Sequence, residues 1–188
     1  MTAMRQKILA CLMLVLLSVL GRPAMAQDAP VSELDLKAAF LFNFTKFVEW
    51  PAEAFQEEDA TVNVGVFDSD EDFTKTLKTL LSDKKAHGRS FSVRKLTNPA
   101  EAKTCHILFF RERETKKMTT AYESVKRLPI LTVGESDDFL DQGGMFNLFF
   151  EDKQLRFEVN QTTAENAKLT VSSKLLRLAK KTRKGGAK

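Results

Sequence analysis

Cysteine and histidine are the side chains best suited to act as nucleophiles, general bases or metal ligands, and those after residue 26 are Cys105, His106 and His87. Cys105 and His106 are neighbours in a segment that predicts a strand, where adjacent side chains point to opposite faces. They therefore cannot share one metal ion, and the sequence has no H-x-x-x-H or C-x-x-C spacing. We expect no metal site.

The sequence also lacks the motifs of common catalytic and cofactor-binding folds. It contains no G-x-G-x-x-G for dinucleotides, no G-x-x-x-x-G-K-[ST] for nucleotide phosphates and no G-x-S-x-G nucleophile turn. The 25 Asp and Glu residues show no spacing that selects a pair for general acid–base catalysis. We therefore expect a protein that is not an enzyme and that has no cofactor.

Cys105 begins an apolar run, Cys105–Phe110, that predicts a buried strand. The other cysteine, Cys11, lies in the N-terminal segment described below, so no internal disulfide is expected after that segment is removed. A single thiol is then either buried or available to an intermolecular partner. Its place at the head of the strand favours a buried, unreactive thiol.

A predicted β-hairpin near the C-terminus carries the main candidate binding residues. Its strands, Met145–Phe150 and Leu155–Asn160, are joined by the four residues Glu151–Gln154. If Phe150 pairs with Leu155, the apolar side chains of both strands form one core-facing side: Phe146, Leu148, Phe150, Leu155, Phe157 and Val159. The opposite side of the hairpin then carries Met145, Asn147, Phe149, Arg156, Glu158 and Asn160.

Aromatic and thioether groups set among fixed polar groups are typical of a recognition surface. We therefore predict that a partner binds this outer side through Asn147, Phe149, Arg156, Glu158 and Asn160. The alternative is that a helix covers the outer side, with Arg156 and Glu158 at its wet margin, because sheets in α/β folds are usually covered on both faces.

Phe42 is a second candidate for partner binding. It lies in the segment Val31–Trp50, which predicts a long helix ended by Pro51. The apolar stripe of this helix, which should face the core, consists of Leu34, Leu36, Phe40, Leu41, Phe44, Phe47 and Val48. Phe42 falls outside that stripe, among polar residues, so it either contacts a partner or packs against a neighbouring loop.

The middle of the chain alternates strand and helix patterns. Strands are expected at 61–67, 90–96, 105–110 and 129–133, and helices at 71–81 and 114–126. The first of these helices is expected to begin at the capping residues 68–70. Further helices are expected at 162–167 and after Ser172. Such alternation predicts a single α/β domain over residues 27–179, with a mixed, mostly parallel sheet, flanking helices and the C-terminal β-hairpin.

Both ends of the chain differ from this domain in composition. Residues 1–26 combine Arg5 and Lys7 with the apolar run Ile8–Leu20 and end in Ala24–Ala26, the three parts of a secretory signal peptide. The alternative, a retained membrane anchor, would need a longer apolar run. We expect cleavage after Ala26, export to the periplasm and no direct membrane insertion. At the other end, residues 180–188 predict a basic, disordered tail.

The net charge of +4 for 188 residues comes from the two ends of the chain. Residues 27–173 hold all 25 acidic residues against 19 of the 29 basic ones, so the domain itself is acidic. Proteins that bind nucleic acid normally present their basic residues on one continuous face. We therefore expect no nucleic-acid partner.

Seven segments, in this order, resemble one family of exported bacterial proteins. They are Lys37–Pro51, Gly88–Arg89, Cys105–Phe109, Leu131–Gly134, Gly143–Asn147, Arg156–Asn160 and Ser172–Leu176. Together they make the chain similar to the YfiR/HmsC-like family, from about Leu34 to Ala179. Some members carry two pairs of cysteines and use disulfides as a redox input, whereas the matched region here retains only Cys105.

The resemblance implies a regulatory function. Characterised members are periplasmic repressors that bind the periplasmic sensor part of an inner-membrane diguanylate cyclase, and so lower cyclic-di-GMP synthesis and biofilm formation. A protein of this kind would have an inner-membrane signalling protein as its partner. The alternative is a periplasmic small-molecule-binding module that signals to another membrane receptor, such as a histidine kinase or a transporter. The sequence leaves both a monomer and a homodimer open.

Overall fold

The structure is a computed structural model, and it describes residues 31–55, 61–67, 71–111 and 115–184. The predicted signal peptide and the predicted capping residues 68–70 lie outside the described residues. None of the helices in the described part is long and apolar enough to cross a membrane.

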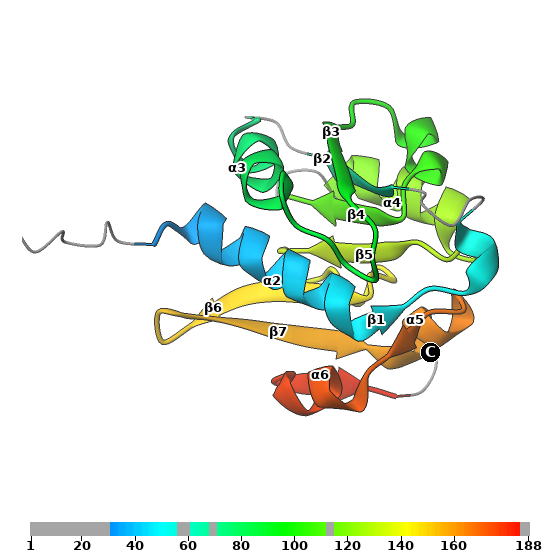
Figure 1. Cartoon of the computed structure of the whole chain (residues 1–188). Coiled ribbons are helices and arrows are strands. Elements are labelled where there is room, and N and C mark those ends of the chain that lie inside the picture. Colours follow the sequence, from blue (N-terminus) through cyan, green and yellow to red (C-terminus); the bar gives the residue numbers. More distant parts are fainter. Residues whose placement is uncertain (1–30, 56–60, 68–70, 112–114, 185–188) are drawn as a thin grey trace, which may run out of the picture. The chain divides into compact units, whose positions relative to one another are not determined.

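A seven-stranded sheet organises the domain, in the order β3-β2-β4-β5-β6-β7-β9 (Figure 1). Its neighbouring strands run parallel, except β6 and β7, which form the antiparallel hairpin. The strands are β2 (Val62–Phe67), β3 (Phe91–Lys95), β4 (Ile107–Phe110), β5 (Leu131–Gly134), β6 (Phe146–Glu151), β7 (Gln154–Asn160) and β9 (Lys181–Arg183). The predicted mixed, mostly parallel α/β fold is confirmed.

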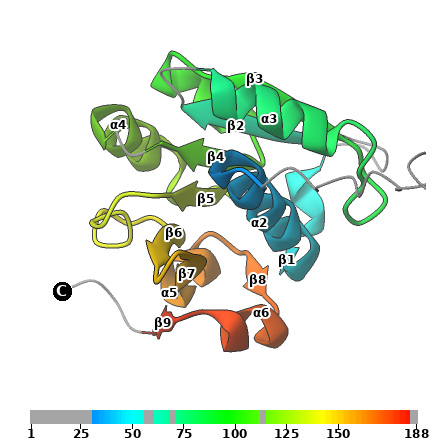
Figure 2. The ribbon, with the colours of Figure 1, turned by 90° about the vertical axis from the view of Figure 1, so that its left-hand side faces the viewer.

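Helices cover the sheet on its two faces (Figure 2). On one face lie α2, α3 and α6, whereas α4 lies on the opposite face beside β4 and β5. The α-helices are α2 (Glu33–Phe47), α3 (Asp72–Leu81), α4 (Thr115–Val125), α5 (Gln161–Asn166) and α6 (Ser173–Leu178). Two 3₁₀ turns, η1 (Ala52–Ala54) and η2 (Pro99–Thr104), complete the helical elements.

Helix α2 begins at a capping box and ends earlier than the sequence predicts. The Ser32 side chain accepts a hydrogen bond from the Asp35 backbone, and the Asp35 carboxylate accepts one from the Ser32 backbone. At the other end, the residues before Pro51 adopt the extended geometry that proline favours. Val48–Glu49 therefore forms strand β1, which pairs antiparallel with β8 (Thr170–Val171) in a small second sheet.

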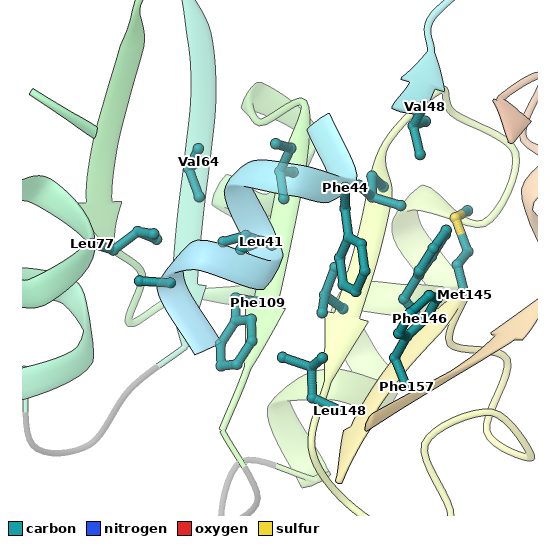
Figure 3. Close-up of a cluster of buried hydrophobic side chains, with 14 of the residues drawn as sticks. Leu41, Phe44, Val48, Val64, Leu77, Phe109, Met145, Phe146, Leu148 and Phe157 are labelled. Atoms are coloured by element: carbon teal, nitrogen blue, oxygen red, sulfur yellow. The ribbon is translucent and has the colours of Figure 1, made fainter. Parts of the chain in front are cut away.

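The main core lies between α2, α3 and the sheet (Figure 3). Leu41 and Phe44 of α2 point toward the strands, and the Phe44 ring lies 4.8 Å from that of Phe146 and 5.1 Å from that of Phe157. Burying large aromatic side chains is the main favourable term for a domain of this size. The stripe predicted for this helix is correct for Leu41 and Phe44, which are fully buried.

The C-terminal tail is ordered further than the sequence predicts. Residues 181–183 form β9, which pairs parallel with β7, from Glu158 opposite Lys181 to Asn160 opposite Arg183. Arg183 also forms a salt bridge with Asp141. At residues 181–183, therefore, a long-range strand pairing fixes a basic segment that the sequence alone predicts to be disordered.

Candidate functional site

The β6–β7 hairpin has the register that the sequence predicts. Phe146 lies opposite Val159, Leu148 opposite Phe157 and Phe150 opposite Leu155. The connection is shorter than predicted, because Glu151 and Gln154 also pair. The turn then consists of Asp152 and Lys153, which both have positive φ angles, 50° and 61°, as type I′ turns require.

The predicted core-facing side of the hairpin is correct except at its tip. Phe146, Leu148, Leu155, Phe157 and Val159 are all buried in the main core. Phe150, next to the turn, is instead 42% exposed, and the Lys37 ammonium lies 5.9 Å from its ring centroid. The hairpin tip therefore adds an exposed aromatic ring close to a cation.

Some side chains of the predicted outer side are exposed to solvent, and others are buried. Phe149 and Glu158 are half-buried, and Arg156 is exposed and donates a 2.5 Å hydrogen bond to Gln154 Oε1. Asn147 is only 4% exposed, so its expected place on the surface is wrong, and Met145 is likewise buried in the main core.

The burial of Asn147 follows from its neighbour in the sheet. Asn147 lies opposite Gly134 of β5, where a Cβ would come within 2.2 Å of the Phe139 ring. Phe139 thus occupies the space that Gly134 leaves and belongs to a second apolar cluster. The segment that carries Phe139 covers this end of the sheet in place of the helix considered as an alternative. Asn147 Oδ1 is buried without a hydrogen-bond partner among the described residues.

The last two candidate residues have structural contacts. Asn160 accepts a hydrogen bond of 3.1 Å from the Thr163 backbone, which makes it the N-cap of α5. Phe42 packs edge-on against Phe91 of β3 at 6.0 Å, and the Lys46 ammonium lies 4.5 Å from the centre of its ring. Phe42 therefore packs against a strand, not the loop that the sequence suggested. Phe149, Arg156 and Glu158 are the predicted surface residues that are at least partly exposed and have no capping or ring contact within the described part of the chain.

A pocket of about 320 Å³ lies at the C-terminal end of α2, and the sequence did not predict it. We call it the Trp50 pocket. Its lining residues are Thr45, Glu49, Trp50, Pro51, Ala52, Phe55, Val62, Ala86, His87 and Arg89. Trp50 Nε1 is buried and has no hydrogen-bond acceptor among the described residues.

A tight turn positions the polar side chains of this pocket. Ala86 and Arg89 exchange two backbone hydrogen bonds of 3.0 Å, while His87 and Gly88 between them have positive φ angles. The turn brings His87 Nε2 to within 2.9 Å of the Thr45 carbonyl, to which it donates. It also places the Arg89 guanidinium 4.1 Å from the centre of the Phe55 ring.

Phe55 connects the pocket to His106, because their rings stack at 4.4 Å. His106 Nδ1 accepts a hydrogen bond of 2.9 Å from the Asn63 backbone, so Nε2 carries the proton and donates to the Ala54 carbonyl at 3.1 Å. Burial lowers the pKa of His106, and the nearby Arg89 charge lowers it further. The ring is therefore neutral and serves to hold β4 against β2 and η1.

The remaining chemical candidates have no catalytic arrangement. Cys105 is buried, as predicted, and this burial raises the pKa of its thiol. No three His, Cys, Asp or Glu side chains of the described residues gather closely enough to hold a metal ion. The candidate sites that the described residues offer are the partly exposed side of the hairpin and the Trp50 pocket.

A model of the YfiR/HmsC-like family matches residues 34–180, and the chain belongs to this family. The predicted family is thereby confirmed. At the level of the family, membership supports a periplasmic regulator of diguanylate cyclase signalling, and the family is regulatory and not catalytic. A search of curated proteins finds no match.

Among solved structures, a conserved domain protein from Vibrio cholerae has a similar fold, with a TM-score of 0.54 and 12% sequence identity. The alignment covers 81% of this chain and 60% of that one, so the chain spans less than two thirds of this neighbour. An ABC domain in complex with L-Trp, from Streptococcus pneumonia, matches at a TM-score of 0.47 and 8% identity over 65% of this chain and 55% of that one. At such low identity the first likeness concerns the fold alone, and the second carries no argument.

Proposed function

We propose that this chain is a periplasmic repressor that binds the periplasmic sensor part of an inner-membrane diguanylate cyclase. Binding would lower cyclic-di-GMP synthesis and biofilm formation. Membership of the YfiR/HmsC-like family supports the regulatory class, and the form of residues 1–26 supports export with cleavage after Ala26. The observation that carries the choice of surface is the exposed outer side of the β6–β7 hairpin.

Three residues of this side are suited to bind a protein. Phe149 offers a partly exposed aromatic ring, and its cross-strand neighbour Arg156 offers a charged fork of donors. Glu158, on the same side of β7, adds an acceptor of opposite charge. Aromatic and arginine side chains are the usual anchors of protein interfaces. The hairpin is held by its buried side, so these groups are presented on a rigid support.

A membrane pull-down tests this proposal. The mature chain, residues 27–188, is immobilised and exposed to detergent-solubilised inner membranes, and retained proteins are identified by mass spectrometry. We expect a diguanylate cyclase to be retained by wild type and less of it by Phe149→Ala and Glu158→Lys. Expression of the wild-type chain should also lower cellular cyclic-di-GMP. Retention of a receptor of another class, with cyclic-di-GMP unchanged, would contradict the proposal.

A small-molecule-binding module is a second candidate function, and the Trp50 pocket favours it. Its volume of about 320 Å³ is within the range of small-ligand pockets, and it combines aromatic walls with the Arg89 guanidinium and the unpartnered Trp50 indole N–H. Native mass spectrometry of protein purified from periplasm tests this function. A ligand that remains with wild type and is lost from Trp50→Leu would support it, whereas a ligand-free protein in both would count against it.

A further inference from the structure

A groove of about 400 Å³ lies between α2, β7 and α6, on the side of the hairpin that carries Leu155 and Phe157, and Arg156 of the outer side also lines it. We call it the α2–α6 groove. Figure 2 shows both helices on this face, with β7 beside them. Its lining residues include Phe40, Phe44, Lys46, Arg156, Phe157 and Leu178.

The floor of the groove is aromatic and fixed by packing. The Phe157 ring meets Phe40 edge-on at 6.1 Å and Phe44 at 5.1 Å, and both Phe44 and Phe157 are buried. Packed rings of this kind lose little further conformational entropy when a ligand binds against them. The floor is therefore a preformed apolar surface.

One side of the groove has an apolar residue that the fold does not bury. Leu178, at the end of α6, is 69% exposed, whereas Leu175 one turn earlier is buried. The partly exposed Phe40 and Phe47 line the same groove, so Leu178 is not an isolated exposed apolar side chain. This surface is open to an apolar partner.

The charged residues that line the groove are of one sign. Its two charged lining residues, Lys46 and Arg156, are basic, and no acidic residue lines it. The charged residues of α6 are also basic, Lys174 and Arg177. An occupant that places negative charge beside these cations is favoured over one that places positive charge there.

An edge of the sheet adjoins the groove. Strand β9 pairs with β7 only from Glu158 to Asn160, after a hydrogen bond of 2.9 Å from the Lys180 backbone to the Phe157 carbonyl. No strand of the described residues pairs with this edge of β7 at Leu155. Backbone groups at such an edge can hydrogen-bond to a segment that lies along it.

We propose that the α2–α6 groove docks an acidic segment with large apolar side chains, supplied by a partner protein. The C-terminal residues of this chain cannot be the occupant, because residues 185–188 contain no acidic and no large apolar side chain. A concave floor with a strand edge beside it also fits a narrow peptide segment better than a flat lipid surface. The groove is a second docking surface: it shares Arg156 with the proposed cyclase-binding side but contains neither Phe149 nor Glu158, and it does not depend on the identity of the cyclase.

Two synthetic peptides provide the test. One alternates Leu and Glu, as suits an extended segment, the other has Lys in place of each Glu, and binding to the mature chain is measured by calorimetry. We expect the Leu/Glu peptide to bind at least about tenfold more tightly than the Leu/Lys peptide. Leu178→Asp and Lys46→Glu should each weaken the Leu/Glu peptide by about tenfold, which is the effect of losing one interface anchor.

Leu128→Asp is the matched control, since Leu128 is also an exposed leucine but does not line the groove. Leu128→Asp should leave peptide binding unchanged. Phe149→Ala and Glu158→Lys should also leave it unchanged, so a failure of the groove proposal can be distinguished from a failure of the proposed function. Equal affinity for both peptides, or unchanged affinity in Leu178→Asp, would overturn the proposal. The proposal would also be overturned if Leu178→Asp and Lys46→Glu weakened only the self-association of the chain, or only its binding to anionic-lipid vesicles. The surface would then be assigned to a second copy of the chain or to a membrane.

Discussion

Phe149 of β6 lies directly opposite Arg156 of β7, on the side of the hairpin that faces away from the main core. On the other side of the same two strands, Leu148 lies opposite Phe157, and both are buried. The hairpin therefore carries a half-buried phenylalanine on its outer side and a buried phenylalanine on its core side. Substitution of each phenylalanine in turn can therefore distinguish an effect on partner binding from an effect on stability.

Truncation of the two phenylalanines should have different effects on stability. Phe157→Ala removes a ring that packs on Phe40, Phe44 and Phe146, so it should lower the free energy of unfolding by about 3–5 kcal/mol. Phe149→Ala should cost about 1 kcal/mol or less, because Phe149 is only half-buried. Chemical denaturation of both variants measures the two values. Equal losses would mean that Phe149 is a core residue.

Cys105 should react slowly with a thiol reagent in the folded chain and rapidly after denaturation. Burial both blocks access to its sulfur and raises the pKa of its thiol, so little thiolate is present at neutral pH. The control is a chain in which Cys105→Ala is combined with Ser173→Cys, because Ser173 is exposed on α6 and should be labelled rapidly. Similar rates for the two native proteins would disprove the burial of Cys105.

His106 should make the fold less stable as the pH falls. Burial holds the pKa of His106 below its usual 6.5, so below that pH the unfolded chain binds a proton that the folded chain does not bind. Protonation of Nδ1 would also remove the acceptor of the Asn63 N–H. The loss begins as the pH falls through 6.5 and is complete only below the lower pKa of the folded state.

His106→Asn provides the comparison, because asparagine offers an acceptor for the Asn63 N–H but does not titrate. Thermal melts between about pH 7.5 and 5.5 should show a smaller decrease in melting temperature for this variant than for wild type. Parallel curves for the two proteins would exclude His106 as the source of the pH dependence.

A buried ion-pair network joins α2 to the end of β5. Glu135 contacts the Lys37 ammonium and accepts a 2.8 Å bond from Arg111 Nε, and the Lys37 and Glu135 side chains are both buried. Among the described residues, Glu135→Gln leaves the Lys37 charge with only the exposed Glu33 as an ion-pair partner, so we expect a loss of about 3 kcal/mol. Glu123→Gln, which breaks the exposed pair with Lys126, should cost less than about 1 kcal/mol. Denaturant titrations that gave equal losses for both would refute a structural role for Glu135.

The sheet and the hairpin register could be predicted from local sequence patterns. Alternating apolar residues specify which side of a strand faces the core, and a shift of one residue would have exposed Leu148 and Phe157. The two-residue turn could not be predicted, because Asp152 and Lys153 adopt positive φ without the Asn-Gly or Asp-Gly signal of such turns.

Features that depend on distant segments were missed. Asn147 is polar and alternates with apolar residues, yet Phe139 and the adjoining Gly134 enclose it. The Trp50 pocket requires Trp50 and Arg89, from segments far apart in sequence, to meet. Both segments resemble the family, but their spacing in the sequence does not indicate that they meet. Strand β9 likewise forms only because β7 offers it an edge.

The central claim is that this chain binds the periplasmic sensor domain of a membrane diguanylate cyclase through Phe149, Arg156 and Glu158. The most direct test is calorimetric titration of the mature chain with the purified periplasmic domain of each membrane diguanylate cyclase in the same genome. We predict saturable binding to one of these domains, weakened about tenfold or more by Phe149→Ala and by Glu158→Lys, with both variants melting near the wild-type temperature. Unchanged affinity in both variants, or no binding to any of these domains, would contradict the claim.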